Sequence, residues 1–175
     1  MIEREDIIMN LDNIKLMRVD NRLVHGQVAV TWTATLSMQT IIVVDNEVAS
    51  SSISQKLMQS IAKGVNIKIY FYTIENFIKD FETTKFPDNI FVVVKTIQVA
   101  RKLVEGGIVC KKINIGNIHY EKGRVAFNRK MYITKQDVED IQYMTAQNCD
   151  VFYQDVPGTP VEKLDHISIE QLDWR

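Results

Sequence analysis

One histidine near the start of the chain lies in a cluster of charged residues whose types and spacing suit phosphate chemistry. Arg18, Asp20, Arg22 and His25 fall within one short segment. Arginine offers a planar fork of donors for phosphate oxygens, and a neutral imidazole is a nucleophile that titrates near physiological pH. An imidazole can attack a phosphoryl group in line while arginines stabilise the charge on its oxygens. The cluster therefore predicts phosphoryl transfer to His25, which needs no metal ion and no other cofactor.

The residues beside His25 fit the same chemistry. Gly26 has no Cβ, so its backbone can approach a tetrahedral anion closely. A helix is expected to begin near Gly26 or Gln27, and the amides of these two residues would then add donors at its N-terminus. Asp20 has three interpretations: a surface salt bridge worth at most about 1 kcal/mol, a carboxylate that orients Arg22, or one that holds the imidazole of His25 in one tautomer.

A strand before this cluster and a helix after it would hold it in place. The apolar run Ile14–Val19 predicts the strand, and Val28, Trp32 and Leu36 recur every four residues, as on one helix face. Trp32 is expected to pack in the core because it shares that face. A strand that leads directly into a helix places the intervening loop at the carboxyl edge of a sheet, where helix N–H groups attract anions.

The rest of the chain repeats apolar strands and amphipathic helices, which predicts an α/β fold. The fold class is an open, mostly parallel twisted sheet of about six to seven strands with helices on both faces. Further strands are expected over residues 40–44, 67–72, 90–94, 111–115 and 151–153. Residues 118–129 are expected to form a hairpin around Glu121-Lys122-Gly123 or an irregular flap. The carboxyl edge of this sheet would carry Arg18 to His25, Asp45, Lys95-Thr96 and Gly116-Asn117, although Asp45 can equally be a turn residue and Thr96 a helix cap.

Length and composition favour one compact domain. The chain has 175 residues, of which 46% are apolar, and the pattern predicts an N-terminal arm at 1–13, a single domain at 14–165 and a C-terminal tail at 166–175. No apolar run approaches the roughly 20 residues that span a bilayer, and the acidic start lacks the features of a signal peptide. We therefore expect a cytoplasmic protein that does not itself cross the membrane.

Several functions are disfavoured by what the sequence lacks. A formal net charge of -1 argues against nucleic-acid binding. The sequence has no glycine-rich dinucleotide or nucleoside-triphosphate motif and no nucleophile elbow. His119 and His166 have no metal-ligand spacing, and Cys110 and Cys149 are expected to pack as small apolar side chains. A phosphohistidine relay is the simplest phosphoryl chemistry that remains.

The same residues resemble a known family. The run Arg18-Val19-Asp20-x-Arg22-Leu23-x-His25-Gly26-Gln27-Val28, with Trp32, Val43-Val44-Asp45 and Ile113-Asn114-Ile115-Gly116-Asn117 after it, is similar to the IIB component of the mannose/fructose/sorbose branch of the bacterial phosphotransferase system. The resemblance extends over roughly Ile14 to Leu164. It departs at Asp20-Asn21, where members often carry two acids, and at Ile118-His119-Tyr120, where they often carry a glycine pair.

This resemblance implies an activity, partners and residue roles. It implies a subunit of a phosphoenolpyruvate-dependent system that accepts a phosphoryl group from phospho-IIA on Nδ1 of His25. The group then passes to a sugar of the mannose, fructose, sorbose or amino-sugar class, held by the membrane subunits IIC and IID. The implied enzyme is a protein-N(pi)-phosphohistidine-sugar phosphotransferase, associated peripherally with the membrane permease. Arg22 and Arg18 would clamp the phosphoryl oxygens, with Gly26, Gln27 and Asp20 in support.

Two other functions remain open from the residues alone. One is a non-catalytic α/β regulatory module that binds a phosphorylated partner, although Arg18 stands where a metal-dependent receiver would place acidic residues. The other is a small enzyme that uses His25 as a general base on an anionic substrate and never becomes phosphorylated.

Overall fold

The computed structural model describes residues 13–26, 28–83, 86, 89–108 and 110–174. Its strands are β1 (Ile14–Val19), β2 (Thr40–Val44), β3 (Lys68–Tyr72), β4 (Ile90–Val94), β5 (Lys112–Ile115), β6 (Val125–Ala126), β7 (Tyr132–Ile133), β8 (Asp150–Tyr153) and β9 (Glu162–Lys163). Its helices are η1 (Val28–Trp32), α2 (Thr33–Thr35), α3 (Asn46–Ala49), α4 (Ser52–Gly64), α5 (Ile74–Thr83), α6 (Ile97–Glu105), α7 (Lys135–Ala146) and η2 (Ile169–Gln171).

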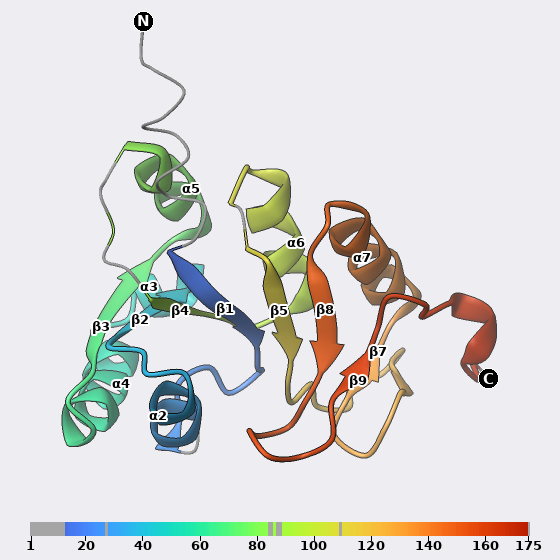
Figure 1. Ribbon diagram of the computed structural model, residues 1–175, viewed down its shortest axis with the longest axis horizontal. Helices are drawn as coiled ribbons and strands as arrows, with labels where there is room; N and C mark the ends of the chain where they lie inside the picture. The colour runs from blue at the N-terminus through green and yellow to red at the C-terminus, as the bar shows by residue number, and fades with distance from the viewer. Residues whose placement is uncertain (1–12, 27, 84–85, 87–88, 109, 175) are drawn as a thin grey trace, which may run out of the picture.

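The main sheet has seven strands in the order β3-β2-β4-β1-β5-β8-β9, which confirms the predicted fold class. All neighbouring strands are parallel except β9, which runs antiparallel to β8. Strand β1 lies in the middle, between β4 and β5 (Figure 1). Because every parallel strand ends at the same edge, the loop after β1 lies next to the loops after β4 and β5.

Two separate apolar cores explain why β2 and β4 are apolar at every position. Both strands are fully buried, as expected for a parallel sheet covered on both faces. One core packs α5, α6 and α7 on the sheet, and the other packs η1, α3 and α4 on the opposite face. Trp32 belongs to the second core and is 3% exposed, so its predicted packing role is confirmed.

The helix after β1 differs from the regular α-helix that was expected. The structure has helical backbone at Gly26, a π-helix at Val28–Trp32 and a single α-turn at Thr33–Thr35. The hydroxyl of Thr33 donates to the carbonyl of Ala29, and such a bond competes with the regular backbone ladder. Wider helical turns of this kind often adjoin functional sites. Gln27 lies outside the described residues.

The expected hairpin exists, but its turn is elsewhere. Strands β6 and β7 pair around residues 127–131. The prediction that the hairpin is centred on Glu121-Lys122-Gly123 was therefore wrong. Asn128 explains the shift, since its Oδ1 accepts from the amides of Lys130 and Met131 at 2.9 Å each, and asparagine favours turns through such bonds. Gly123 adopts φ +92° in a separate turn that precedes the hairpin.

The end of the chain packs against the domain. Ile167 is buried in the core, and Leu172 and Trp174 pack on it. Gln142 of α7 donates to the carbonyl of Ile167 at 2.9 Å. Residues 1–12, most of the expected N-terminal arm, lie outside the described part of the chain. None of the helices described is both long and apolar enough to cross a bilayer.

Candidate functional site

Backbone hydrogen bonds join three loops at the carboxyl edge of the sheet, those after β1, β4 and β5. The amide of Asp20 donates to the carbonyl of Val94 at the end of β4, at 2.9 Å. The amide of Asn21 donates to the carbonyl of Asn117 at 2.9 Å, and the amide of Gly116 to Val19 at 2.8 Å. The loop that carries His25 is therefore fixed to the loops after β4 and β5, as the sequence predicted for this edge.

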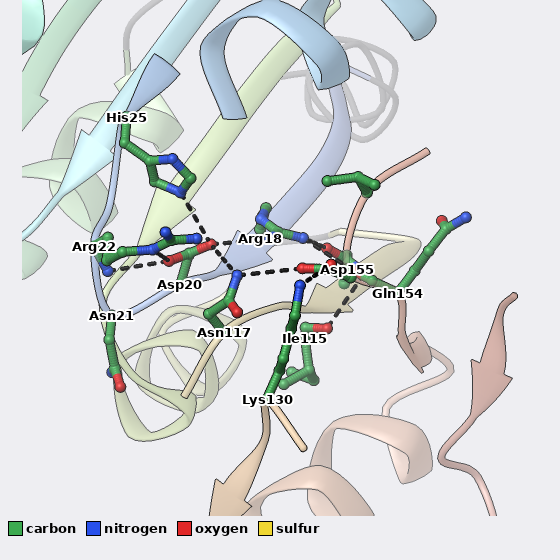
Figure 2. A network of polar contacts seen from close by, with 12 residues as sticks. Arg18, Asp20, Asn21, Arg22, His25, Ile115, Asn117, Lys130, Gln154 and Asp155 are labelled. Atoms are coloured by element: carbon green, nitrogen blue, oxygen red, sulfur yellow. Dashed lines mark hydrogen bonds and ion pairs between the residues drawn. The ribbon is translucent and has the colours of Figure 1, made fainter. Parts of the chain in front are cut away.

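Asp20 is the centre of the polar network. Its side chain is 0% exposed, and Figure 2 shows His25, Arg22, Arg18 and Asn117 arranged around it. Its Oδ2 accepts from Arg18 Nη2 at 2.9 Å, and it lies 3.5 Å from both His25 Nε2 and Asn117 Nδ2. Its Oδ1 accepts from the amide of Arg22 at 3.0 Å and lies 3.6 Å from Arg22 Nε.

This network keeps Asp20 ionised. Burial alone would raise the pKa of the carboxyl group, but the hydrogen bond with His25 and the charge of Arg18 outweigh it and hold the pKa well below its usual range. An ionised carboxylate can only accept hydrogen bonds. When His25 is neutral, its Nε2 must therefore carry the proton to satisfy this contact, which leaves the lone pair on Nδ1.

Arg18 is buried beneath the loop, with 1% of its side chain exposed. It stands opposite Asn114 in the register of β1 and β5, donates to Asn114 Oδ1 and to the carbonyl of Gln154, and lies 5.2 Å from the ring centroid of Trp32. Because only 1% of this side chain is exposed, its position favours a structural role over the expected clamping of phosphoryl oxygens. Its guanidinium instead holds Asp20.

His25 and Arg22 remain accessible, with 23% and 46% of their side chains exposed. The turn before them is held by buried Leu23, whose φ of +53° lies in the left-handed region that a branched side chain rarely adopts. Strained residues of this kind concentrate at functional sites. The carbonyl of His25 accepts from the amide of Ala29 at 3.0 Å, so the histidine stands at the start of the helix, with exposed Gly26 after it.

The remaining edge residues mostly have structural roles. Asp45 and Thr96 cap α3 and α6 through the amides of Val48 and Val99, so the capping interpretation of Thr96 is confirmed. Lys95 Nζ pairs with Glu47 at 3.0 Å. Within the part of the chain that the structure describes, no cluster of histidine, cysteine and acidic side chains could hold a metal ion.

From the sequence alone, Asp155 and Lys130 were not placed in this network. Asp155 accepts from Asn117 Nδ2 at 3.4 Å and pairs with Lys130 of the β6–β7 turn. They are far from His25 in sequence and follow no motif. The position of Asp155 just after β8 could have indicated its role, because β8 also ends at the carboxyl edge of the sheet.

Comparison with known proteins agrees with this geometry. Residues 14–173 match the family model described as the PTS system sorbose subfamily IIB component. The N-acetylgalactosamine-specific phosphotransferase enzyme IIB component 1 of Escherichia coli is 43% identical over 156 residues, which are 89% of this chain and 99% of that protein. The crystal structure of IIB component 1 of the E. coli N-acetylgalactosamine system is similar with a TM-score of 0.82 at 44% identity, over 86% of this chain and 98% of that one. A second N-acetylgalactosamine IIB structure, from Streptococcus pyogenes, gives a TM-score of 0.79 at 32% identity, over 89% and 98% of the two chains.

Proposed function

Because the chain belongs to the sorbose subfamily of the IIB components of sugar phosphotransferase systems, we propose that Nδ1 of His25 is its phosphoryl carrier. The observation that supports this most directly is the contact between buried, ionised Asp20 and His25 Nε2. A neutral imidazole held in this way offers Nδ1 as its nucleophilic atom.

The transfer step follows from that arrangement. The Nδ1 lone pair of His25 attacks phosphorus, and the bond between phosphorus and the donor's imidazole nitrogen breaks as the new bond forms. The electron pair of the broken bond returns to the donor ring. The proton on Nε2 of His25 stays in place, and Asp20 stabilises the positive charge that develops on the ring. In the second transfer a sugar hydroxyl oxygen attacks phosphorus and forms the new O–P bond. The bond to Nδ1 breaks and returns its electron pair to His25, and the hydroxyl proton is released to solvent.

The two arginines have different roles in this proposal. Arg22 is accessible and can bind phosphoryl oxygens with its planar fork of donors. Arg18 is buried and acts as a positioning residue that fixes Asp20. Gly26, at the start of the helix, leaves room for the phosphoryl group, since a Cβ placed there meets nothing within 4 Å. The backbone N–H groups at the N-terminus of the helix would add donors.

The partners that we propose are those with which IIB components work. A IIA protein donates the phosphoryl group, and the sugar is held by the membrane subunits IIC and IID, beside which this subunit acts in the cytoplasm. The full reaction is that of a protein-N(pi)-phosphohistidine-sugar phosphotransferase. Relatives named for N-acetylgalactosamine at 43% and 30% identity make this amino sugar the first substrate to test.

The experiment is phosphorylation by a phosphorylated IIA protein of an N-acetylgalactosamine system. We expect an acid-labile, base-stable label that is lost in His25→Ala and kept in His119→Ala and His166→Ala, the two matched controls that the chain offers. Label retained in His25→Ala would contradict the proposal. The regulatory-module alternative predicts binding of phospho-IIA without covalent label on any of the three histidines.

A further inference from the structure

Beside the site, residues 118–131 form a positively charged surface segment, which we call the flap. It holds Lys122, Arg124, Arg129 and Lys130 against the single carboxylate Glu121, whereas the chain as a whole has a formal net charge of -1. Tyr120 in the same segment is 65% exposed. The flap is thus a cationic surface with an exposed aromatic ring.

Direct contacts join the flap to the loop of His25. Asn21, four residues before His25, accepts from the amide of His119 at 2.7 Å through its Oδ1. Its Nδ2 donates to the carbonyl of Lys95 at 2.9 Å. In Figure 2 the side chain of Asn21 points away from Asp20. The backbone next to Tyr120 is therefore held against the loop that carries His25.

A second tie joins the other end of the flap to the same network. Lys130 pairs with Asp155, and the Nδ2 of Asn117 lies 3.4 Å from Asp155 Oδ1 and 3.5 Å from Asp20 Oδ2 (Figure 2). One end of the flap is therefore bonded to Asn21 in the loop of His25, and the other end is joined through Asp155 to Asn117, which lies 3.5 Å from Asp20. Its position relative to His25 is fixed by the fold.

The flap is also internally braced, so it presents its exposed groups in a defined arrangement. The rings of Tyr120 and Tyr132 make an edge contact with centroids 5.7 Å apart. Arg124 Nη1 donates to the carbonyl of His119 at 2.8 Å, and its Nη2 pairs with Glu121 at 3.2 Å. A rigid aromatic side chain loses little entropy on binding, which is why tyrosine is common among residues that dominate interfaces.

Two of the cations are available to a partner. Lys122 and Arg129 are exposed and form no ion pair with any described residue, whereas Arg124 and Lys130 are paired within the protein. Unpaired surface charges next to a site raise the association rate of an oppositely charged partner. A protein that arrives with a dianionic phosphoryl group is such a partner.

We propose that the flap is the docking surface for the phosphorylated IIA donor, with Tyr120 as its aromatic anchor and Lys122 and Arg129 as its attracting charges. This rests on the proposed function and adds the surface that the donor contacts. Charge favours the donor over the membrane subunits, because those subunits meet this chain after it has itself acquired the negative phosphoryl group.

The anchor is tested with two phosphoryl donors, since phosphoramidate is a small molecule that labels histidine without docking. Tyr120→Ala should lower kcat/KM for phosphorylation by phospho-IIA about tenfold and leave the phosphoramidate rate unchanged. Tyr120→Phe should keep the rate with both donors. Tyr70→Ala, which removes an exposed tyrosine from edge strand β3, is the matched control and should change neither rate.

The charges are tested by reversal. Lys122→Glu/Arg129→Glu should slow transfer from phospho-IIA about tenfold at low ionic strength, with the deficit shrinking as salt is added. Lys56→Glu/Lys63→Glu on α4, also exposed lysines, is the matched control and should have little effect.

The outcomes are distinguishable. Unchanged phospho-IIA kinetics in both flap variants would overturn the docking proposal, as would flap variants that impair only transfer to sugar, which would assign the flap to the membrane subunits. Equal losses with both donors would show that the flap supports His25 and does not dock the donor. A wild-type chain that neither donor labels would overturn the proposed function itself.

Discussion

At the scale of single residues, the two arginines of the site differ in burial. Arg18 lies inside the protein and Arg22 lies at its surface. Arg18 is 1% exposed and Arg22 is 46% exposed, yet both contact Asp20. Removing a buried ion-pair partner leaves an uncompensated charge, whereas an exposed pair contributes little to stability. Substitution of Arg18 should therefore mainly lower the stability of the fold, and substitution of Arg22 should mainly slow phosphoryl transfer.

Arg22→Ala should slow phosphorylation of His25 at least tenfold, because the phosphoryl oxygens lose a planar donor. The same substitution should lower the free energy of unfolding by less than about 1 kcal/mol. Arg18→Ala should lower it by about 3 kcal/mol or more. Urea denaturation and the rate of labelling by phospho-IIA measure the two effects. An Arg18→Ala protein of wild-type stability would contradict the structural role.

Asp20→Asn should destabilise the protein by about 3 kcal/mol at neutral pH, because Arg18 loses its buried counterion. The folded-state pKa of Asp20 lies below its ordinary value of 3.8, so its carboxylate stabilises the fold above pH 3.8 and this contribution is lost as the pH falls further. The stability difference between wild type and Asp20→Asn should therefore shrink as the pH falls below about 4. Urea midpoints from pH 5 to pH 3 check it, and a difference that stays constant or widens over this range would be inconsistent with it.

At the scale of elements, the close approach of β1 and the end of β5 holds Arg18 in place. A Cβ added at Gly116 would lie 2.3 Å from the guanidinium carbon of Arg18. The end of an arginine side chain usually moves aside easily, but this one is held by Asp20, Asn114 and Gln154. Glycine is therefore required after β5 because the buried cation occupies the space of a side chain.

Gly116→Ala should cost about 1–3 kcal/mol of stability, as overpacking does in a tight interior, and should slow phosphorylation because Arg18 and Asp20 shift together. Gly64→Ala at the end of α4, where a Cβ meets nothing within 4 Å, is the matched control and should be neutral or slightly stabilising. Thermal unfolding and labelling by phospho-IIA report the two effects. Full activity and stability in Gly116→Ala would refute this account of the packing.

The sequence predicted those helices and strands that carry a recognisable residue pattern within their own length. Runs such as Ile90–Val94 are apolar throughout because both faces are buried, and Thr134 with Asp137, three residues apart, forms the capping box of α7. The two-residue strand β9 and the turn at 127–131 were missed, since their pairing depends on segments elsewhere in the chain. The contact between Lys130 and Asp155 was missed for the same reason, because the two residues are distant in sequence. The burial of Arg18 also depends on distant residues, since Trp32 and Asn114 pack around it.

At the scale of the whole molecule, the sheet separates two apolar cores, and the polar network around Asp20 lies at the carboxyl edge of the sheet. The two cysteines illustrate this separation, because both lie in the core opposite to that of Trp32. Burial raises the pKa of Cys110 to about 12 and also raises the pKa of Cys149. Neither thiol is expected to be a nucleophile in the folded protein.

Ellman's reagent should accordingly react with neither cysteine in the native protein at pH 8 and with both after unfolding in guanidinium chloride. Phosphorylation of His25 should be unaffected by prior treatment of the native protein with the reagent. Rapid modification of one thiol without loss of structure would show that this core is more open than the described packing implies.

The central claim is that Nδ1 of His25 carries the phosphoryl group while Asp20 holds the proton on Nε2. Long-range proton–nitrogen NMR of the phosphorylated protein, with its histidines labelled by nitrogen-15, measures this most directly. We predict a single phosphohistidine, at position 25, with phosphorus bonded to Nδ1 and a proton on Nε2. Phosphorus on Nε2, or on His119 or His166, would contradict the claim.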